Sequence, residues 1–450
     1  MAGPVISNPL VEQLAVFAAG VRFEDMPRED VAAIKRLVLD TLGCALGAVG
    51  CEPVRLLAPM MRPPSGAQDE ATLIGTGERV SLDSAILHNG ALVRYLDFMD
   101  VYWARDICHP SENIPVALAA AQAGRHSGRA LIEAIAVAYE AQVRLADAFS
   151  LEGIGLHHVS AAGFVAPLVL GKLWGLGVNE LAHAVALGGF RHLTAAALVQ
   201  GRLSMAKAVG YALPSSECVA STRLAAAGFT GPLGVLEGMG VKQFDLSPGT
   251  SSAPKVSLKR FPVQFTLQSP VEAALQLREA LRGDIDAIES LLIEVQPDAH
   301  RRTADAAKLA PSNRETADHS LPCCVAMALC DGELTSRQFD TGRWQAPDIR
   351  ALMAKMRCEP SSELEQRYPG GRPARLTART LDGKARTILV EAPLGDAKHP
   401  MNDAQLLAKF LAQAEPVLGE NQAMRAARTI MELETLADVS ALCALLAAQP

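Results

Sequence analysis

The chain has few aromatic residues and no excess of positive charge. Phe, Trp and Tyr make up 4% of its 450 residues while 49% are hydrophobic, so its core must be built mainly from small and aliphatic side chains. Lysine and arginine total 42 against 49 acidic residues, a formal net charge of −7. Proteins that bind nucleic acid or an anionic membrane usually carry a basic patch. We therefore expect neither partner, and any anionic substrate must be met by locally gathered cations.

Long apolar runs and cysteine motifs are also missing. The apolar stretch 159–170 is followed by Lys172, so no run reaches the roughly 18–20 residues of a membrane span. The nine cysteines are odd in number and include no C-x-x-C, and the N-terminus carries no positively charged leader. These features predict a cytoplasmic protein with free thiols. Cys323, Cys324 and Cys330 lack zinc-finger or ferredoxin spacing, so no metal is expected; a cluster of distant cysteines is the open alternative.

Common nucleotide and hydrolase motifs are absent too. The sequence has no P-loop, no H-E-x-x-H and no G-x-S-x-G. Gly75-Thr-Gly77 and Gly153-Ile-Gly155 lack the third glycine of a dinucleotide-binding fingerprint. Nucleotide, NAD and serine-hydrolase functions are therefore disfavoured.

Helical periodicity dominates residues 9–244. Val31, Ile34 and Val38 recur at spacings of three and four in a segment that ends near Gly47. Several helices are apolar on most faces, which is typical of helices buried among other helices. Further helices are predicted at 84–95, 113–123, 129–148, 161–173 and 178–187.

A connector and a mixed pattern follow. Residues 246–254 are rich in Pro, Gly and Ser, which is typical of a linker. Asp382-Gly383 lies between two alternating runs, a strong hairpin signal. The predicted elements here are a helix at 271–281, a strand at 290–295 and hairpin strands at 375–380 and 385–390.

Helical periodicity returns after Asn402, first to Leu411 and then over 423–446. The predicted fold class is mainly α with an α+β part. We expect the N-terminal part of a helical domain at 1–255, a smaller α+β lid at 256–395, and C-terminal helices at 396–450 that return to the helical domain.

Polar clusters beside the apolar helices are candidates for a site. Asp97 and Asp100 precede His109. They are either an acid/base set or an ordinary helix end with solvated acids. His157 and His158 precede a very apolar segment, where they either bind an anion, act as a base or serve a structural role.

The remaining clusters carry cations. Lys207 lies in an apolar region and is either desolvated and catalytic or extends to water. Lys259-Arg260 follows the linker and is either a solvated pair or a carboxylate clamp across a hinge. His319, in Asp-His-Ser, means little alone.

Together and in this order, the motifs resemble the MmgE/PrpD family, which contains 2-methylcitrate dehydratase and cis-aconitate decarboxylase. The resemblance runs from about residue 8 to 415, and the motif versions are closer to the dehydratase branch. The segments that carry it are His88-Asn-Gly90 to Phe98, His109-Pro-Ser-Glu-Asn-Ile-Pro115, Gly155-Leu-His157, Ser204-Met-Ala-Lys207, Gly228-Phe-Thr-Gly-Pro232, Lys259-Arg-Phe-Pro262, Gln268-Ser-Pro-Val-Glu-Ala-Ala274, Glu315 to Pro322, Ala326 to Gly332, and Leu407-Ala-Lys-Phe410.

The resemblance implies a helical domain with an inserted α+β lid and a site in the cleft. Family members are usually homodimers and need no metal or organic cofactor. It also implies a small anionic carboxylate as substrate and a place in propionate metabolism. The family's catalytic positions fall on Asp97, His109, His157, Lys207 and Lys259, and the expected substrate-binding residues are Arg260, Gln268, His319, Val101 and Cys323.

Two of these positions depart from the family pattern. Val101 stands where many members have Thr, and Cys323 where many have Tyr. Each change removes a hydrogen-bonding group from the expected pocket, and such groups discriminate strongly between substrates. We therefore expect an alkyl-bearing acid such as 2-methylcitrate to be a better substrate than citrate.

Dehydration of a citrate-like acid needs a base, an acid and fixed cations. We expect His109 or Lys207 as base and His157 as acid. Lys259 and Arg260 would hold carboxylates, and Asp97 would orient His109 or balance the cations. Decarboxylation of cis-aconitate, isomerisation or epimerisation of a related acid, and ligand binding without catalysis are the alternatives.

Overall fold

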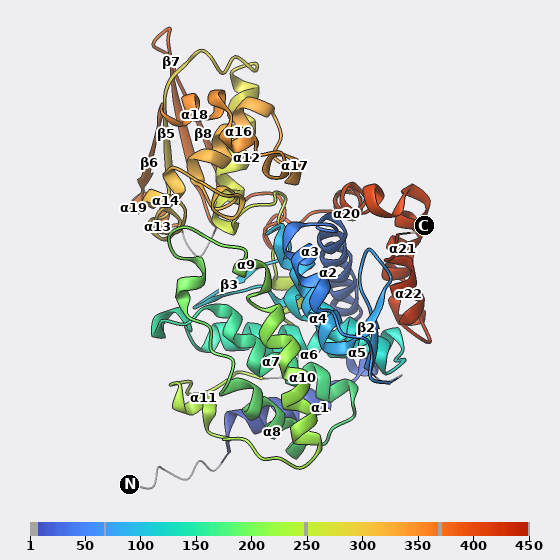
Figure 1. The fold of residues 1–450 in the computed structure, drawn as a ribbon. Helices are drawn as coiled ribbons and strands as arrows, with labels where there is room; N and C mark the ends of the chain where they lie inside the picture. The colour runs from blue at the N-terminus through green and yellow to red at the C-terminus, as the bar shows by residue number, and fades with distance from the viewer. Residues whose placement is uncertain (1–7, 67–68, 247–250, 368–370, 449–450) are drawn as a thin grey trace.

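The computed structural model describes residues 8–66, 69–246, 251–367 and 371–448, which form a large helical lobe and a smaller lobe at one end of it (Figure 1). The chain is mainly helical, as the fold-class prediction states. Of the predicted linker 246–254, residues 247–250 lie outside the described residues.

The large lobe is built from helices that pack around an alanine-rich core. Gly43 shows how close this packing is, because a Cβ at that position would lie 3.1 Å from the ring of Phe410. The helices from the first part of the chain are α1 (Leu10–Gly20), α2 (Arg28–Gly47), α3 (Glu52–Leu57), α4 (Leu82–Tyr95), α5 (Ile114–Ala123), α6 (Gly128–Ala148), α7 (Ala162–Leu173), α8 (Val178–Gly189), α9 (Ala206–Val209), α10 (Ala212–Ala226) and α11 (Val235–Gly238).

Two small antiparallel pairs of strands interrupt these helices. They are β1 (Glu70–Thr72) with β2 (Arg79–Ser81), and β3 (Tyr102–Trp103) with β4 (Ile107–Cys108). The helical periodicity did not predict them, because strands of two or three residues are too short to show alternation.

The C-terminal helices return to the large lobe, where α20 and α21 lie beside α2 and α22 packs on α21 (Figure 1). They are α20 (Asp403–Leu418), α21 (Glu420–Met431) and α22 (Ser440–Leu445). The helical pattern predicted over 423–446 is interrupted between α21 and α22. The chain breaks between α21 and α22 because its backbone is hydrogen-bonded to the segment before α6: Gly128 N–H donates to Leu436 O at 2.9 Å, and Val439 N–H to His126 O at 3.0 Å.

The small lobe contains a mixed sheet with strand order β6-β5-β7-β8. β5 pairs parallel with β6 and antiparallel with β7, which forms the predicted hairpin with β8. Helices α12 and α16 pack on the sheet. The elements are α12 (Gln268–Ala280), β5 (Ile288–Val295), α13 (Pro297–Thr303), α14 (Ala306–Leu309), α15 (Arg314–Ala317), α16 (Leu321–Asp331), α17 (Ser336–Asp340), α18 (Pro347–Met353), β6 (Met356–Pro360), α19 (Ser362–Glu365), β7 (Ala374–Thr380) and β8 (Ala385–Val390).

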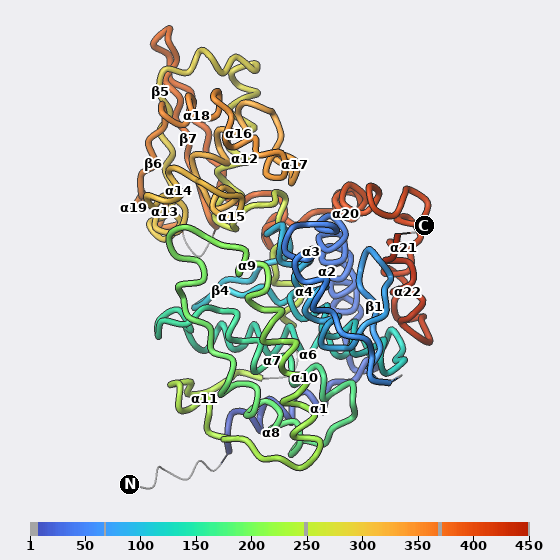
Figure 2. Tube along the Cα trace, in the orientation of Figure 1, coloured from blue at the N-terminus to red at the C-terminus, as the bar shows by residue number. Residues whose placement is uncertain are grey.

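Each lobe has its own hydrophobic core, and the chain crosses between them twice (Figure 2). The large core takes residues from 10–258 and 406–446, and the small core from 261–390. The two crossings touch, since Leu258 N–H donates to Gly395 O at 2.8 Å. A Cβ on Gly395 would lie 2.1 Å from the carbonyl oxygen of Leu258, so this approach requires glycine.

Within the described ranges, no single helix is long and apolar enough to cross a membrane; α2 with the segment Glu52–Met60 passes that test only as a pair bent by 75°.

Candidate active site

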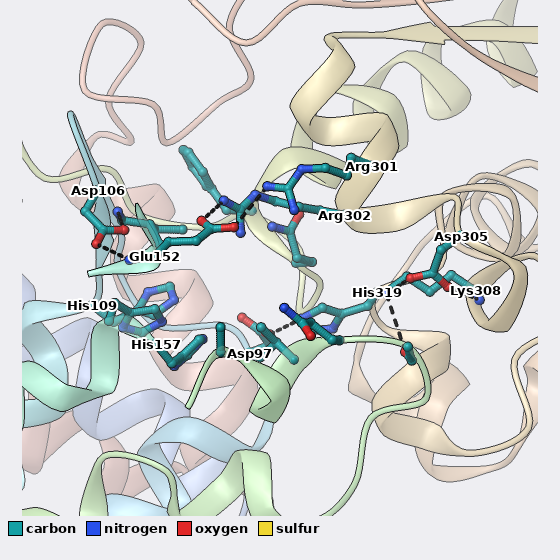
Figure 3. A pocket seen from close by; sticks show the side chains of 18 of the residues that line it. Asp97, Asp106, His109, Glu152, His157, Arg301, Arg302, Asp305, Lys308 and His319 are labelled. Carbon is teal, nitrogen blue, oxygen red and sulfur yellow. Dashed lines mark hydrogen bonds and ion pairs between the residues drawn. The ribbon is translucent and has the colours of Figure 1, made fainter. Parts of the chain in front are cut away.

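A cavity of about 250 Å³ lies where the two lobes meet (Figure 3). The large lobe contributes the end of α4, the region of β4 and the loops before α7 and α9, and the small lobe contributes α13, α14 and the segment before α16. The polar residues that line it are Arg94, Asp97, Asp106, His109, Glu152, His157, His158, Gln200, Lys259, Gln264, Arg301, Arg302, Asp305, Lys308 and His319. Five of the predicted site residues are therefore brought together here.

Asp97 lies just after α4 with its backbone in the left-handed region, at φ 50°. Its N–H donates to the carbonyl of Arg94 at 3.2 Å, which closes the end of the helix. Aspartate is among the few non-glycine residues that adopt this conformation readily. The turn leaves the Asp97 side chain buried at the cavity.

Three cations surround the Asp97 carboxylate. Oδ2 lies 3.2 Å from Arg94 Nη1 and 3.0 Å from Lys207 Nζ. Lys259 Nζ donates to Oδ1 and, at 2.8 Å, to the backbone carbonyl of Asp97. Burial alone would raise the pKa of Asp97, but Arg94, Lys207 and Lys259 outweigh it and hold the pKa well below its usual value. Asp97 is thus an ionised counterion for these cations.

Asp318 and His319 complete the cluster from the small lobe. Lys207 Nζ lies 2.9 Å from Asp318 Oδ2, so it is held between two carboxylates. His319 donates from Nδ1 to Asp318, and its Nε2 lies 3.5 Å from Asp97 Oδ2. Burial, together with Lys207, lowers the pKa of His319 to about 4, so its ring is neutral at pH 7. The cluster therefore also joins the two lobes.

His109 has its tautomer fixed by one hydrogen bond. Its Nδ1 lies 2.5 Å from the backbone carbonyl of Asp100, which can only accept, so Nδ1 carries the proton and Nε2 is the basic nitrogen. Burial, followed by Lys259 and Arg94, holds the pKa of His109 well below its usual value. The Asp100 carboxylate in turn accepts from Ser111 Oγ at 2.5 Å and Tyr139 OH at 2.7 Å. His109 is a neutral, preorganised imidazole, oriented by Asp100 and not by Asp97.

His157 and His158 lie beside it. The ring centroids of His157 and His158 are 4.1 Å apart, and those of His109 and His158 are 5.2 Å apart. His157 Nδ1 accepts a long 3.5 Å contact from Val159 N–H, which favours a proton on Nε2. Burial, with Arg94 and Arg302, lowers the pKa of His157 to about 3. In the free protein His157 is therefore a neutral hydrogen-bond donor.

The predicted clamp residue Arg260 and its neighbour Gln268 lie outside this cavity. Arg260 Nη1 is 3.3 Å from Glu272, and its side chain is 40% exposed. Gln268 Oε1 accepts from the backbone of Arg260 at 2.9 Å and of Phe261 at 3.0 Å. Gln268 thus fixes the turn that follows Lys259, and neither residue is among the cavity's lining.

Val101 and Cys323 do not line the cavity either. Val101 is buried and pairs through its backbone with Ser257, with Val101 N–H 2.9 Å from Ser257 O. Cys323 is fully buried in α16, in the core of the small lobe. The prediction that these two side chains contact the substrate is therefore not supported by the lining of this cavity.

Sequence reasoning missed several charged residues of the cavity. Arg94 precedes Asp97 by three residues on the same helix end, a spacing that would have suggested the ion pair. Asp318 stands next to His319 in a motif already noted. Arg301 and Arg302 gave no signal, because they face the site only through the docking of α13.

Asp97, Asp318 and His319 place three potential metal ligands within 4.8 Å of one another. The Lys207 ammonium lies within 3.0 Å of both carboxylates, and Lys259 also contacts Asp97. A metal cation at this point would meet two like charges, so this donor set suits ammonium groups better than a metal ion. Metal independence stays a prediction.

The arrangement combines a neutral base with buried cations. The His109 imidazole can take a proton, and Lys259 and Arg94, both buried side chains, can stabilise negative charge beside it. Such a site suits proton abstraction next to a carboxylate.

Comparisons with known proteins identify relatives that are named as enzymes of carboxylic acids. A family model for the MmgE/PrpD N-terminal domain matches residues 12–247, and one for the MmgE/PrpD C-terminal domain matches residues 261–435. The 2-methylcitrate dehydratase of Cupriavidus necator is 29% identical over 421 residues, covering 83% of this chain and 84% of that protein. The enzyme of the same name from Escherichia coli K12 is 28% identical over 416 residues, 83% of each chain. A cis-aconitate decarboxylase of Aspergillus terreus is 24% identical over 475 residues, 97% of this chain and 96% of that protein.

Proposed function

The chain belongs to the MmgE/PrpD family, and from this premise we propose that it is a hydro-lyase that removes water from a citrate-like tricarboxylate such as 2-methylcitrate, without a metal or organic cofactor. The observation that carries the proposal is the neutral His109 imidazole, with its tautomer fixed by Asp100, in a cavity lined by Lys259 and Arg94. The similarity to proteins named 2-methylcitrate dehydratase supports the substrate class.

The base in this proposal is His109. Its Nε2 removes the proton α to a substrate carboxylate, while the Nδ1–H bond to Asp100 keeps the ring in place. Lys207 was the other candidate base. Its Nζ lies 3.0 Å from Asp97 and 2.9 Å from Asp318, so it holds these two carboxylates instead.

Negative charge on the substrate carboxylate is stabilised by Lys259 and Arg94. A lysine ammonium has three N–H donors. Two are directed at Asp97, and the third is available to the substrate. Removing one such preorganised contact typically lowers kcat about 10²–10³-fold.

Loss of hydroxide from the neighbouring carbon needs a proton donor, and His157 is our choice. Its pKa of about 3 makes it neutral in the free protein. The carboxylates of a bound trianion favour the charged imidazolium and raise this pKa, so His157 takes up a proton from solvent as substrate binds and can then donate it to the leaving hydroxyl group.

Decarboxylation of cis-aconitate is the second candidate, favoured by the similarity to the Aspergillus terreus enzyme over nearly the whole chain. The same cations would stabilise the carbanion left by loss of CO₂.

Proton NMR of the purified protein with 2-methylcitrate, citrate and cis-aconitate separates these functions. Water loss from 2-methylcitrate is the expected result. Loss of CO₂ from cis-aconitate would favour the second candidate, solvent exchange or inversion alone would indicate an isomerase or epimerase, and no reaction with any of the three would contradict the proposal.

A further inference from the structure

Arg301 and Arg302 lie in the last turn of α13 and share a carboxylate from the other lobe, as Figure 3 shows. Arg301 Nη2 lies 3.0 Å from Glu152 Oε1, and Arg302 Nη2 donates to Glu152 Oε2. Each oxygen of Glu152 therefore faces one guanidinium. This arrangement defines a subsite shaped for one carboxylate group.

The two arginines are also held from within their own helix. Asp298 Oδ1 accepts from Arg301 Nη2 at 2.5 Å, and Asp298 Oδ2 accepts from Arg302 Nε at 2.7 Å. Arg302 also lies over the ring of Trp103, 5.3 Å from its centroid. Asp298 is not part of the cavity lining, whereas Glu152 is. The guanidinium groups would thus keep their orientation if Glu152 were to leave.

Moving the Glu152 carboxylate away from the two arginines should cost little free energy. Its side chain is 37% exposed, so its carboxylate can be solvated without rearrangement of a core. It begins a single short 3₁₀ turn, Glu152–Ile154, in a loop of the large lobe. Its partners Arg301 and Arg302 belong to the small lobe, so the contact is an ion pair between lobes that borders the cavity.

We propose that Arg301 and Arg302 bind one carboxylate of the substrate, and that Glu152 occupies this subsite in the free protein and is displaced when a tricarboxylate binds. The inference rests on the proposed function for the substrate class. It assigns Glu152 a role in specificity, as an internal competitor that a substrate carboxylate must replace.

Charge balance supports an exchange over simultaneous binding. The two guanidinium groups carry two positive charges, which Asp298 and Glu152 already match. A further carboxylate beside Glu152 would meet like-charge repulsion at contact distance. An acid that lacks a carboxylate at this end of the cavity leaves Glu152 in place and gains nothing from the arginines.

Isothermal titration with tricarballylate tests the exchange directly. This tricarboxylate has the carbon skeleton of citrate without the hydroxyl, so it cannot be dehydrated. Glu152→Gln removes the competing charge and keeps the side-chain shape. We expect Kd to fall about tenfold at low ionic strength, which corresponds to about 1.4 kcal/mol. Glu333→Gln is the matched control, because it removes a Glu–Arg ion pair with Arg337 in the small lobe, outside the cavity lining, and should leave Kd unchanged.

A double-mutant cycle tests whether the tighter binding of tricarballylate in Glu152→Gln depends on the arginines. Arg302→Gln should weaken tricarballylate binding at least tenfold, and Glu152→Gln added to it should bring no further gain. Arg301→Gln, at a side chain that is 60% exposed, replaces Arg302→Gln if that variant does not fold. Circular dichroism checks the fold of each variant.

Three results would overturn the proposal: a Kd that is unchanged or higher in Glu152→Gln, a gain that persists without the arginine, or no binding of tricarballylate to the unmodified protein. The proposed function is judged separately, by turnover of 2-methylcitrate in the NMR assay. The titration can therefore contradict the displacement of Glu152 while the NMR assay supports the lyase function. The NMR assay can likewise contradict the lyase function while the titration supports the displacement.

Discussion

One hydrogen bond at His109 decides which ring nitrogen can take a proton. The role of Nε2 as the base can therefore be tested by a single substitution. His109→Gln keeps a donor for the Asp100 carbonyl but removes the basic Nε2. We expect kcat to fall about 10²–10⁴-fold, the usual contribution of a positioned acid–base group. Steady-state turnover of 2-methylcitrate measures this. His399→Gln, at an exposed histidine of the second crossing, is the control and should keep full activity; equal activity of the two variants would remove His109 from the mechanism.

Glu112 gives a prediction about pH and stability. Burial raises the pKa of Glu112 to about 8, against the opposing effect of Arg94, whose Nε lies 3.6 Å away. Since the folded pKa lies above the unfolded value, the folded protein holds an extra proton. The resulting stability is fully present below about pH 4.5 and is lost as pH rises through 8.

Glu112→Gln mimics the protonated side chain at every pH. The variant should therefore lose less stability than the unmodified protein between pH 6 and pH 9, by up to about 1.4 kcal/mol per pH unit. Urea unfolding at both pH values measures the difference, and Glu333→Gln is the exposed control. Parallel losses in the variant and the unmodified protein would show that Glu112 does not titrate in this range.

The residues of the site were partly predictable from the sequence. Asp97, His109 and His157 stand in motifs with recognisable neighbours, and the structure places all three at one cavity. Arg301 and Arg302 have no local signal, because only the docking of α13 brings them there. Val101 and Cys323 are implied only by the family resemblance, and their side-chain surroundings are set by packing that no local pattern reveals.

At the scale of elements, α20 stabilises the backbone next to the site through Lys409. Lys409 Nζ donates to the carbonyls of Phe98 at 2.9 Å and Lys259 at 2.8 Å, and lies 2.6 Å from Asp40 Oδ1. Helix α20 thus holds the backbone on either side of the Asp97–Lys259 contact.

Lys409→Met should therefore lower the free energy of unfolding by about 3–5 kcal/mol, because it leaves the buried Asp40 without its cation. Urea denaturation checks this. Adding Asp40→Asn should recover part of the loss, and Lys242→Met, at an exposed lysine after α11, should change stability by less than about 0.5 kcal/mol. A loss as small as that of Lys242→Met would mean that α20 does not depend on this contact.

Elements with strong local signals were found from the sequence, and those that depend on distant partners were not. The β7–β8 hairpin is confirmed because its Asp382-Gly383 turn acts locally, with Gly383 at φ 80°. β6, with the sequence Met-Arg-Cys-Glu-Pro, alternates over only four residues before a proline, too short a signal to predict a strand without its pairing with β5. The break between α21 and α22 likewise depends on hydrogen bonds to the segment before α6.

At the scale of the whole molecule, the two cores lead us to propose two domains, with the helical one built from both ends of the chain. The charged cluster lies between them and is neutralised by lysines, so we predict that activity needs no metal. Enzyme dialysed against a chelator should keep its turnover of 2-methylcitrate. Stoichiometric metal by elemental analysis, with activity lost on its removal, would contradict this.

Because the cavity takes residues from both lobes, a bound tricarboxylate should stabilise both at once. His109 comes from the large lobe, and Arg301 and Arg302 come from α13 of the small lobe. At about 100 times its Kd, tricarballylate should add about 2.7 kcal/mol of stability. Hydrogen exchange followed by mass spectrometry should then slow in α5 and α6 of the large lobe and also in α13 and α14 of the small one. In Arg302→Gln, the same degree of saturation should protect the large lobe and leave α13 less protected. Protection confined to one lobe in the unmodified protein would mean that the ligand does not bridge the two, and that the cavity between them is not where it binds.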